Sequence, residues 1–413
     1  MNPRLAELQA YPFERLAKLK AGIEPPAHLT HIPLSIGEPK HAPPDFVLQV
    51  LRDSLDGLGQ YPSTVGLPDL RSACARWLER RFKLGANQVG LDAVLPVNGT
   101  REALFAFAQA VIDPSERKSP LVAMPNPFYQ IYEGAALLAG ATPYFFETPA
   151  ENNFLPDLDA IPASVWERVQ LLYLCSPGNP GGSVMSMSQL RRAIELADRY
   201  DFLIAADECY AELYADELHP PPSLLNAALE AGHSNFERCV VFHSLSKRSS
   251  LPGLRSGFVA GDPSVLRNFL LYRTYHGCAM PIPTQLASIA AWNDDDHVKA
   301  NRALYREKYA RVLPILAPHL EVNQPAGGFY LWPKVQGDDA RFTRDLFAEQ
   351  NVTVVPGSYL ARHTRGGAID PSGDNPGTGR IRISLVADVE DCVTAARRIV
   401  DFIQGIQSQG RTS

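Results

Sequence analysis

A lysine at the end of an apolar run is the first residue whose setting suggests chemistry. Lys247 closes the segment His243-Ser244-Leu245-Ser246-Lys247, which continues from the apolar residues 240–242. Its neighbours Arg248 and Arg255, together with partial burial, would lower the pKa of its amine, and the neutral amine is the form that attacks a carbonyl carbon to give a Schiff base. A solvated surface cation is the alternative, since most lysines are exposed.

A carboxylate follows another apolar run, earlier in the chain. Asp207 comes directly after residues 202–206, where an unpaired charge would be costly. A helix cap or a structural ion pair would account for it, and so would the partner of a protonated pyridine nitrogen, which keeps a cofactor ring an electron sink. In the second interpretation Tyr210 and Asn179, the latter held in a rigid turn by flanking prolines, would lie near the phenolic oxygen of that ring.

A candidate phosphate site lies at residues 99–101. Gly99-Thr100-Arg101 follows one short apolar run and begins a helical pattern. Free backbone N–H groups and the helix dipole at such a junction suit a phosphate. Arg255 could add a forked contact to the same phosphate. An ordinary turn and a surface arginine are the alternatives, and each of these patterns is weak when taken alone.

These residues share one place in the predicted fold, because each follows a short apolar strand. Ligands of open α/β sheets bind at the carboxyl ends of the strands. Continuous apolar runs are typical of strands covered on both faces, and their alternation with helices predicts an α/β domain with a largely parallel sheet. The expected strands are 94–97, 121–124, 144–146, 171–175, 202–206, 240–242 and 258–260, and the expected helices include 46–55, 67–81, 101–112, 130–139 and 187–200.

The pattern changes beyond about residue 283, where a long helical stretch precedes short strands and two further helices. The predicted strands are 329–332, 353–355 and 382–385, and the predicted helices are 340–350 and 388–404. We therefore expect a large domain at 45–285 that carries the site and a small α+β domain at 286–413. Residues 1–44, rich in proline, are expected to form an extended arm and part of the small domain. Residues 362–379 predict a mobile surface loop.

Composition excludes several classes of function. The chain has 413 residues, 45% hydrophobic and 20% charged, with a formal net charge of -6. These values are typical of a folded globular protein and predict neither nucleic acid nor membrane as a partner. No export signal or spanning segment is recognisable, so we expect a cytoplasmic protein. The six cysteines form no C-x-x-C pair, which favours buried free thiols over a zinc site or a disulfide framework.

The motifs together resemble those of the class I/II aminotransferases, which are fold-type-I pyridoxal-phosphate enzymes. Ser244-x-Ser246-Lys247 followed by Pro252-Gly253-Leu254-Arg255-Ser256-Gly257 is similar to the family's lysine signature. Other matching motifs keep the family's order: Ile36-Gly37-Glu38-Pro39, Tyr61-Pro62, Gly66-Leu67 and Arg380-Ile381-Arg382-Ile383-Ser384. One motif departs from the family, because the usual Asn-Pro-x-Asn-Pro-Thr-Gly is Ser176-Pro177-Gly178-Asn179-Pro180-Gly181-Gly182 here, with Asn179 retained.

The resemblance implies a role for each matching residue. As implied catalytic residues, Lys247 would form the internal aldimine with pyridoxal phosphate and move a proton between Cα and C4′, Asp207 would pair with the pyridine nitrogen, and Tyr210 would contact the ring oxygen. Substrate would be bound by Asn179, by the backbone near Gly37 and by a bidentate fork from Arg382 to the α-carboxylate. Other implied cofactor contacts are Tyr129, stacked on the ring, Gly99, Thr100, Arg101, Ser244, Ser246 and Arg255 on the phosphate, and Tyr61, which would reach the phosphate of the partner subunit. A homodimer with shared active sites, and no metal, is implied.

Within the family, residues 126–140 and 275–281 resemble the proteobacterial N-succinyldiaminopimelate aminotransferases of lysine biosynthesis. This implies reversible transfer of an amino group from glutamate to N-succinyl-2-amino-6-oxopimelate. The extra carboxylates of such a substrate require a second cationic group. Candidates for it are Lys40, Arg248, Arg273, His276 and Arg365, among which the sequence does not choose.

Other functions stay open at this point. The same fold and cofactor could serve aspartate, N-acetylornithine, an aromatic amino acid or a β-lyase reaction. A non-catalytic pyridoxal-phosphate-binding regulatory module is a different class of alternative. Such regulators carry a winged helix-turn-helix, and the roughly 45 proline-rich residues before the family-like region are too few for one.

Overall fold

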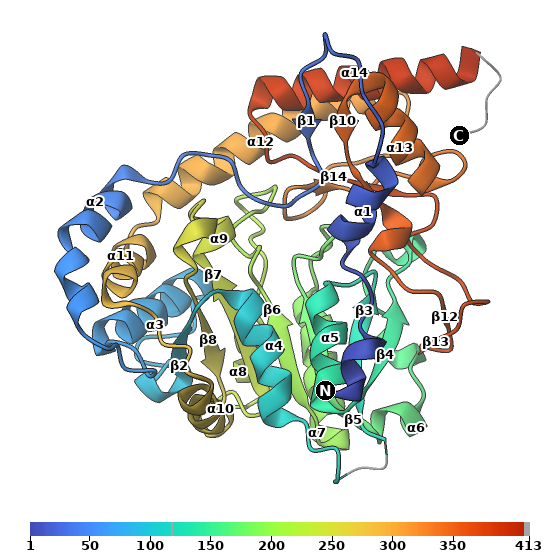
Figure 1. Ribbon diagram of the computed structural model, residues 1–413. Helices are drawn as coiled ribbons and strands as arrows, with labels where there is room; N and C mark the ends of the chain where they lie inside the picture. Colours follow the sequence, from blue (N-terminus) through green and yellow to red (C-terminus); the bar gives the residue numbers. More distant parts are fainter. Residues whose placement is uncertain (117–118, 409–413) are drawn as a thin grey trace.

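A seven-stranded sheet forms the centre of the protein, in the computed structural model that describes residues 1–116 and 119–408 (Figure 1). Its strand order is β2-β8-β7-β6-β5-β3-β4. β8 runs antiparallel to both of its neighbours, and the other pairs are parallel. The strands are β2 (Val94–Val97), β3 (Leu121–Asn126), β4 (Thr142–Glu147), β5 (Val169–Cys175), β6 (Leu203–Asp207), β7 (Cys239–Ser244) and β8 (Gly257–Gly261). The predicted α/β class and largely parallel sheet are confirmed.

Helices cover both faces of this sheet, as the continuous apolar strands require. Along β5, Leu172 and Leu174 enter one core while Leu171 and Tyr173 enter the other, because successive side chains point to opposite faces. The first core is closed by α3 (Pro68–Phe82), α7 (Met187–Tyr200), α8 (Leu224–Glu230) and α11 (Ile282–Asn293); the second is closed by α4 (Thr100–Val111), α5 (Gln130–Ala139) and α10 (Pro263–His276).

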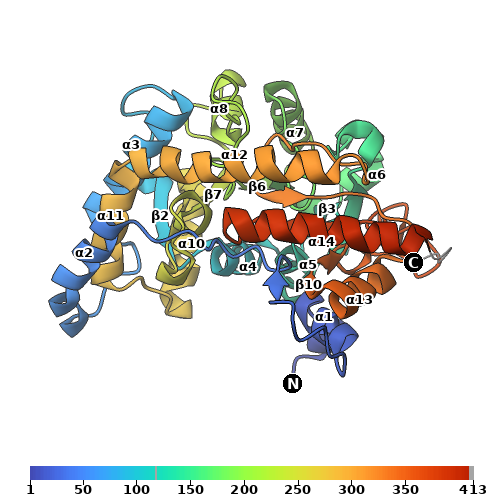
Figure 2. The ribbon, with the colours of Figure 1, turned by 90° about the horizontal axis from the view of Figure 1, so that it is seen from above.

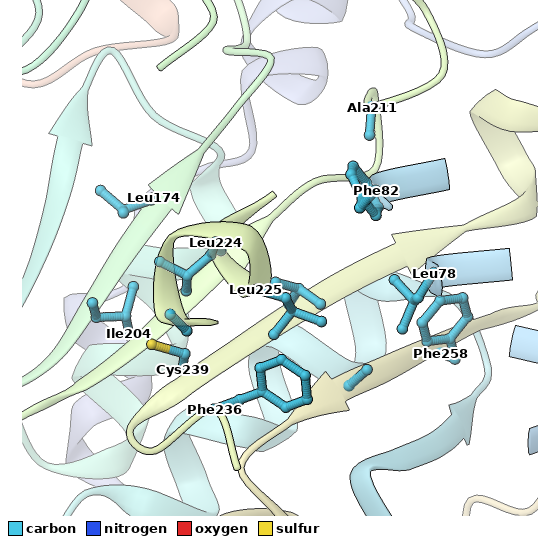
Figure 3. Packing of buried hydrophobic residues seen from close by; sticks show 14 of the residues in the cluster. Leu78, Phe82, Leu174, Ile204, Ala211, Leu224, Leu225, Phe236, Cys239 and Phe258 are labelled. Carbon is cyan, nitrogen blue, oxygen red and sulfur yellow. The ribbon is translucent and has the colours of Figure 1, made fainter. Parts of the chain in front are cut away.

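Figure 3 shows part of the first core, where side chains from separate helices and strands meet. Leu224 and Leu225 of α8 lie among Ile204 of β6 and Cys239 of β7, and Leu78 of α3 lies near Phe258 of β8. All of these side chains are fully or nearly fully buried. The sheet edge that carries the site therefore rests on a rigid, close-packed support.

A smaller three-stranded sheet in the C-terminal part has the order β11-β14-β9. Its core also takes in Ile32 and Leu34, because β1 pairs with β10. Helices α12 and α14 lie side by side over this part (Figure 2). The elements are β1 (Ile32–Pro33), α12 (Asp296–Leu316), β9 (Tyr330–Leu331), α13 (Asp339–Gln350), β10 (Val352–Thr353), β11 (Val355–Pro356), β14 (Ile381–Ser384) and α14 (Val389–Ser408).

The N-terminal segment differs from the expected extended arm. Residues 3–7 form a 3-10 turn, and α1 (Pro12–Lys20) is a helix that begins at a proline, which is favoured in the first helical turn. Leu16 of α1 is buried against Trp332, Val355 and Leu360, so tertiary contacts hold the helix in place. The expectation of an extended arm and connecting loop was wrong for residues 12–20, because the prolines that disfavour a helix lie after α1.

The segment 362–379 is a loop, but part of it is tied to the sheet. β12 (Thr364–Arg365) and β13 (Ala368–Ile369) form a small hairpin, and the Phe145 N–H of β4 donates to the Gly367 carbonyl at 2.8 Å. Its mobility stays a prediction. The division into domains also stays a prediction, and its boundary at residue 285 falls inside α11, which packs on α3 and α2 (Asp45–Asp53).

Two further expectations concern helices and thiols. Among the described residues, no helix combines the length and the apolar character that a membrane crossing needs. All six cysteines are free: Cys74, Cys239 and Cys392 are buried and Cys175, Cys209 and Cys278 are half-buried. The cytoplasmic location stays a prediction.

Candidate active site

A cleft opens where β5, β6 and β7 end. The register of the strands places Cys175 beside Asp207 and Asp207 beside Phe242, so the residues that follow these strands meet at one edge. The cleft also takes in residues from the N-terminal segment and the C-terminal part. Its lining is Tyr11, Phe13, Ile36, Gly37, Thr100, Arg101, Tyr129, Gln130, Cys175, Asn179, Asp207, Cys209, Tyr210, Lys247, Tyr330, Leu360 and Arg382.

Lys247 presents its amine to this cleft from the short helix α9 (Leu245–Arg248). The Ser244 hydroxyl caps the helix by accepting from the Ser246 N–H at 3.1 Å. The amine of Lys247 donates to the Gly37 carbonyl. Burial lowers the pKa of this amine to about 8. Cys209, Glu38 and Asp207 act in the opposite direction but offset the effect of burial only in part. A large neutral fraction is therefore present at mildly alkaline pH, as a nucleophilic amine needs, and a freely solvated surface lysine does not fit this placement.

Asp207 is a buried carboxylate aimed into the same cleft, 3% exposed. Its Oδ2 accepts from the Tyr132 hydroxyl at 2.9 Å and its Oδ1 from the Cys209 N–H at 3.3 Å. Burial raises its pKa, and these hydrogen bonds oppose that rise. Among the described residues none forms an ion pair with Asp207, so the site suits a ligand that brings a cationic N–H to it.

Sequence reasoning missed Tyr132. It lies in the first turn of α5, three residues after the N-cap residue Tyr129, and the two ring centroids are 5.7 Å apart with nearly perpendicular planes. Tyr129 lines the cleft and Tyr132 lies behind it, fully buried. The i, i+3 spacing was a visible signal, but only the fold shows that Tyr132 reaches Asp207.

Arg382 is held at the opposite wall of the cleft. Its Nη1 donates to Asn179 Oδ1 at 3.0 Å and its Nη2 to the Ser35 carbonyl at 2.8 Å. Its Nε is buried without a hydrogen-bond partner in the structure, and the guanidinium lies over the Tyr330 ring, 4.5 Å from its centroid. Because Asn179 uses its oxygen as the acceptor, its amide nitrogen is left to donate into the cleft.

Tyr210 and Gly37 complete this wall. The Tyr210 hydroxyl lies 2.8 Å from the hydroxyl of Tyr330, a lining residue that the sequence did not suggest. A Cβ added at Gly37 would overlap the Tyr330 side chain, so glycine lets the backbone approach this closely. The Gly37 carbonyl and the Tyr210 ring both lie near the Lys247 amine, which is 5.9 Å from the ring centroid.

The predicted phosphate site is a compact cradle at the N-terminus of α4. Gly99 has a φ of +88°, and a Cβ there would lie 2.5 Å from Arg255 Nη2. Arg255 is anchored over the same turn, since its Nη1 donates to the Pro252 carbonyl at 2.9 Å and its Nη2 to the Asn98 carbonyl at 3.4 Å. The guanidinium and the helix N-terminus at Thr100 therefore converge, as an anion site requires.

Arg101 is placed differently from the rest of the cradle. Its Nε donates to the Tyr129 hydroxyl at 2.8 Å and its Nη2 to the Tyr11 hydroxyl at 3.1 Å. Its side chain thus runs along the cleft towards the N-terminal segment. Its backbone stays at the first turn of α4, next to Thr100.

Together these groups fit pyridoxal phosphate. The cradle at Gly99 brings the Arg255 guanidinium to a helix N-terminus, which suits a phosphate, the Tyr129 ring offers an aromatic face, and buried Asp207 suits a protonated ring nitrogen. Lys247 supplies the amine for the aldehyde.

Tyr61 is not part of the cleft of its own chain. It lies between α2 and α3, and its side chain is fully exposed at 104%. A role at a phosphate therefore requires a second subunit.

The five predicted cations for distal carboxylates lie outside the described cleft lining. Four of them already form ion pairs with a carboxylate: Lys40 with Glu38, Arg248 with Asp295, Arg273 with Glu102 and Arg365 with Asp370. The fifth, His276, is exposed and stacks on the ring of Tyr272. Glu102, His276 and Cys278 also place possible metal ligands within 4.8 Å of one another. Arg273 already neutralises that carboxylate, so the group gives little reason to expect a cation.

Comparison with known proteins identifies what the chain is similar to. The family described as "Aminotransferase class I and II" matches residues 30–399. An LL-diaminopimelate aminotransferase from Nitratidesulfovibrio vulgaris is 31% identical, over 96% of this chain and 97% of its own length. The 4-dedimethylamino-4-oxo-anhydrotetracycline transaminase OxyQ from Streptomyces rimosus is 32% identical, over 96% and 100%. An aminotransferase structure from Neisseria meningitidis Z2491 has a TM-score of 0.90 and 50% identity, covering 97% of this chain and 99% of that one.

Proposed function

Because the chain belongs to the class I and II aminotransferases, which use pyridoxal phosphate, we propose that it is the N-succinyl-LL-2,6-diaminopimelate:2-oxoglutarate aminotransferase of lysine biosynthesis. Aminotransferases act on an amino acid and a 2-oxo acid. Glutamate and 2-oxoglutarate are the proposed second pair, and the proposed assembly is a homodimer with shared active sites. The observation that carries the aminotransferase reaction is the convergence of Lys247, Asp207 and Arg382 on one cleft, and the choice of substrate rests on the charges around it.

Each of these residues has a distinct task in the proposed reaction. Bound pyridoxal phosphate supplies an electron sink for the electrons of the substrate Cα–H bond. Arg382 holds the α-carboxylate with its unpaired donors, and Asn179 fixes the arginine in place. Lys247, next to the Gly37 carbonyl, is positioned to take and return the proton at Cα. Asp207 would hold the positive charge of the ring nitrogen, and Gly99, Thr100, Ser244, Ser246 and Arg255 would hold the phosphate.

Charge in the cleft supports an acylated substrate. Beside Lys247 and Arg382, Arg101 is the remaining cation in the described lining, and Asp207 is the one carboxylate there. A succinyl group would bring a carboxylate that Arg101 can bind in a fork, with the Tyr11 hydroxyl beside it. The free distal ammonium of LL-diaminopimelate would find no carboxylate in this lining except Asp207, which is committed to the cofactor.

LL-diaminopimelate is nevertheless the second candidate substrate, because a relative that covers nearly the whole chain carries that name. OxyQ, at similar identity, acts on a different class of molecule by its name. Identity near 30% therefore does not decide the substrate. A direct comparison of substrates is needed.

The test begins with the absorbance spectrum of the purified holoenzyme before and after glutamate. A spectral change that 2-oxoglutarate reverses is expected, and it should be absent in Lys247→Ala. Single-turnover rates with N-succinyl-LL-diaminopimelate, LL-diaminopimelate, aspartate, N-acetylornithine and an aromatic amino acid then rank the substrates. The succinylated compound is expected to be fastest, and a faster reaction with unmodified LL-diaminopimelate would contradict the proposal.

Two variants separate the two carboxylate sites. Arg382→Lys is expected to damage every α-amino acid donor, since a point charge cannot replace the fork. Arg101→Gln is expected to lower kcat/KM about tenfold for the succinylated substrate while changing glutamate much less. Equal losses with both substrates would place Arg101 at the cofactor instead.

A further inference from the structure

A buried polar chain behind Lys247 has no part in the proposed chemistry. Asn301 on α12 donates from Nδ2 to the carbonyls of Lys247, at 3.1 Å, and Arg248, at 3.2 Å. These carbonyls end α9, a helix of four residues, and would otherwise lack an intrahelical partner. One side chain from a distant helix thus fixes the backbone that carries the amine.

The other end of Asn301 is fixed by a histidine. His41 Nδ1 lies 2.7 Å from Asn301 Oδ1, and His41 Nε2 lies 2.7 Å from Lys308 Nζ. Because the amide nitrogen of Asn301 donates to carbonyls, its oxygen must accept, so Nδ1 of His41 carries a proton. Nε2 then accepts from the Lys308 ammonium. The imidazole is neutral, with one tautomer imposed from both sides.

His41 also belongs to the chain segment that faces the Lys247 amine. It lies four residues after Gly37, whose carbonyl accepts from that amine, and the Ser250 hydroxyl donates to the His41 carbonyl at 2.7 Å. Residues 37–41 are therefore tied to the nitrogen of Lys247 at one end. At the other end they are tied to Ser250, just after α9, and through Asn301 to the carbonyls that end this helix. We define these five residues as the strap.

Lys308 has an environment that fits this task alone. Its side chain is 0% exposed, its further bond is to the Val386 carbonyl at 3.4 Å, and the Tyr305 ring lies 4.9 Å away. Among the described residues no carboxylate forms an ion pair with it. The titratable groups that face it are His41, Tyr305, Asp388 and Cys392, and Asp388 also faces His41. A buried lysine without such a partner is costly, so its presence here calls for a structural reason.

We propose that Asn301 and His41 are positioning residues for Lys247, which hold the strap and the end of α9 in register so that the amine stays at the reacting face of the cleft, while Lys308 fixes the tautomer of His41. The proposal rests on the proposed role of Lys247. The alternative is a network that merely stabilises the junction between α12 and the large sheet.

The variants Asn301→Ala and His41→Phe break the chain at two points. His41→Gln is the conservative counterpart, since its amide can donate to Asn301 and accept from Lys308. Asn226→Ala is the matched control: Asn226 also donates to a buried backbone carbonyl, that of Phe82 at 2.6 Å, but it lies on α8 away from the cleft.

The first readout is the pH dependence of acetylation at Lys247 in the full-length, cofactor-free chain, followed by mass spectrometry of the peptide. The wild-type midpoint is expected near the pKa of about 8 that burial imposes. Asn301→Ala and His41→Phe should raise it by about one unit, because a displaced amine gains water. His41→Gln and Asn226→Ala should leave it unchanged.

The second readout is the glutamate half-reaction of the holoenzyme. We expect kcat to fall about tenfold in the two disrupting variants with KM nearly unchanged, since misplacement of the amine affects proton transfer more than binding. The positioning role would be overturned if Asn301→Ala and His41→Phe lowered the melting temperature but kept the wild-type acetylation midpoint and kcat. Equal acetylation midpoints and equal kcat values in His41→Phe and His41→Gln would also overturn it. Failure of the proposed role of Lys247 would look different, because the wild-type protein would then form no cofactor adduct at Lys247. A different preferred substrate would leave both readouts, the acetylation midpoint and the glutamate half-reaction, unaffected.

Discussion

Tyr132 is the side chain on which the charge state of Asp207 depends most directly. Its hydroxyl gives Asp207 a hydrogen bond at 2.9 Å in a site where burial favours the protonated acid. Without it, the carboxylate would bind its proton more tightly and hold a cationic ring nitrogen less well.

Tyr132→Phe is therefore expected to weaken pyridoxal-phosphate binding about tenfold, the effect of losing one hydrogen bond to a charged group. Titration of the cofactor-free protein, followed by fluorescence, measures this. Tyr173→Phe is the control, because Tyr173 stacks on Tyr132 with centroids 4.5 Å apart but donates to the Leu104 carbonyl at 2.7 Å. A similar loss in both variants would point to packing and not to Asp207.

Lys308 gives a pH-dependent prediction. Burial lowers its pKa to about 8 from the ordinary 10.5, so the unfolded chain binds more protons between these values. The lysine therefore costs stability below pH 8, and the cost disappears as pH rises towards 10.5. Lys308→Met should be more stable than wild type at pH 7 by about 2 kcal/mol, less the free energy of the lost hydrogen bond to His41. This difference in stability should shrink as pH rises.

Urea unfolding at several pH values between 7 and 10.5 measures the difference in free energy. Lys18→Met is the control, because Lys18 is exposed and pairs with Glu14 on the surface of α1. Its curve should run parallel to that of wild type. A constant difference between Lys308→Met and wild type over this range would show that Lys308 keeps an ordinary proton affinity in the folded protein.

The junction of β2 with α4 shows how an element can dictate a single residue type. Gly99 combines a φ of +88° with an approach to Arg255 that leaves no room for a Cβ. Both the backbone conformation and the closeness of the guanidinium are needed to form the cradle.

Gly99→Ala should lower the free energy of unfolding by about 1 kcal/mol or more and should weaken cofactor binding, because Arg255 must move away. Gly253→Ala is the matched control. Gly253 lies two residues before Arg255, and a Cβ added there would have no atom within 4 Å. Melting temperature and cofactor affinity, measured for both, test the idea. A wild-type affinity of Gly99→Ala for pyridoxal phosphate would show that the phosphate binds at another place.

We expect the active site to be complete only in a dimer. Tyr61 is fully exposed and does not line its own cleft, although the family resemblance gives it a phosphate contact across subunits. The proposal predicts that inactive Lys247→Ala and impaired Tyr61→Ala chains restore activity when mixed, because a hybrid contains one intact site.

After co-refolding of equal amounts, about one quarter of wild-type activity is expected, since about half of the dimers are hybrids with one good site each. The activity of each variant refolded alone gives its baseline. Activity equal to the mean of the two baselines would mean that Tyr61 does not act across the interface.

The predictable part of this protein is what short stretches of chain specify. Apolar runs covered on both faces gave the seven strands of the large sheet, and residues such as Asp207 and Lys247 could be placed because each follows the end of such a run. Gly99 and Thr100 were recognisable for the same reason, since a strand, a glycine and a helix start are adjacent in the chain. Local backbone preference and burial are written in neighbouring residues.

Contacts between distant segments were not accessible in this way. Tyr132 meets Asp207 across 75 positions, Arg382 meets Asn179 across 203, and Lys308 meets His41 across 267. The direction of the Arg101 side chain depends on Tyr11, and helix α1 depends on packing against Trp332 and Leu360. The free energy of such pairings comes from burial and from the polar partners that burial makes necessary, so it exists only once the whole chain has folded.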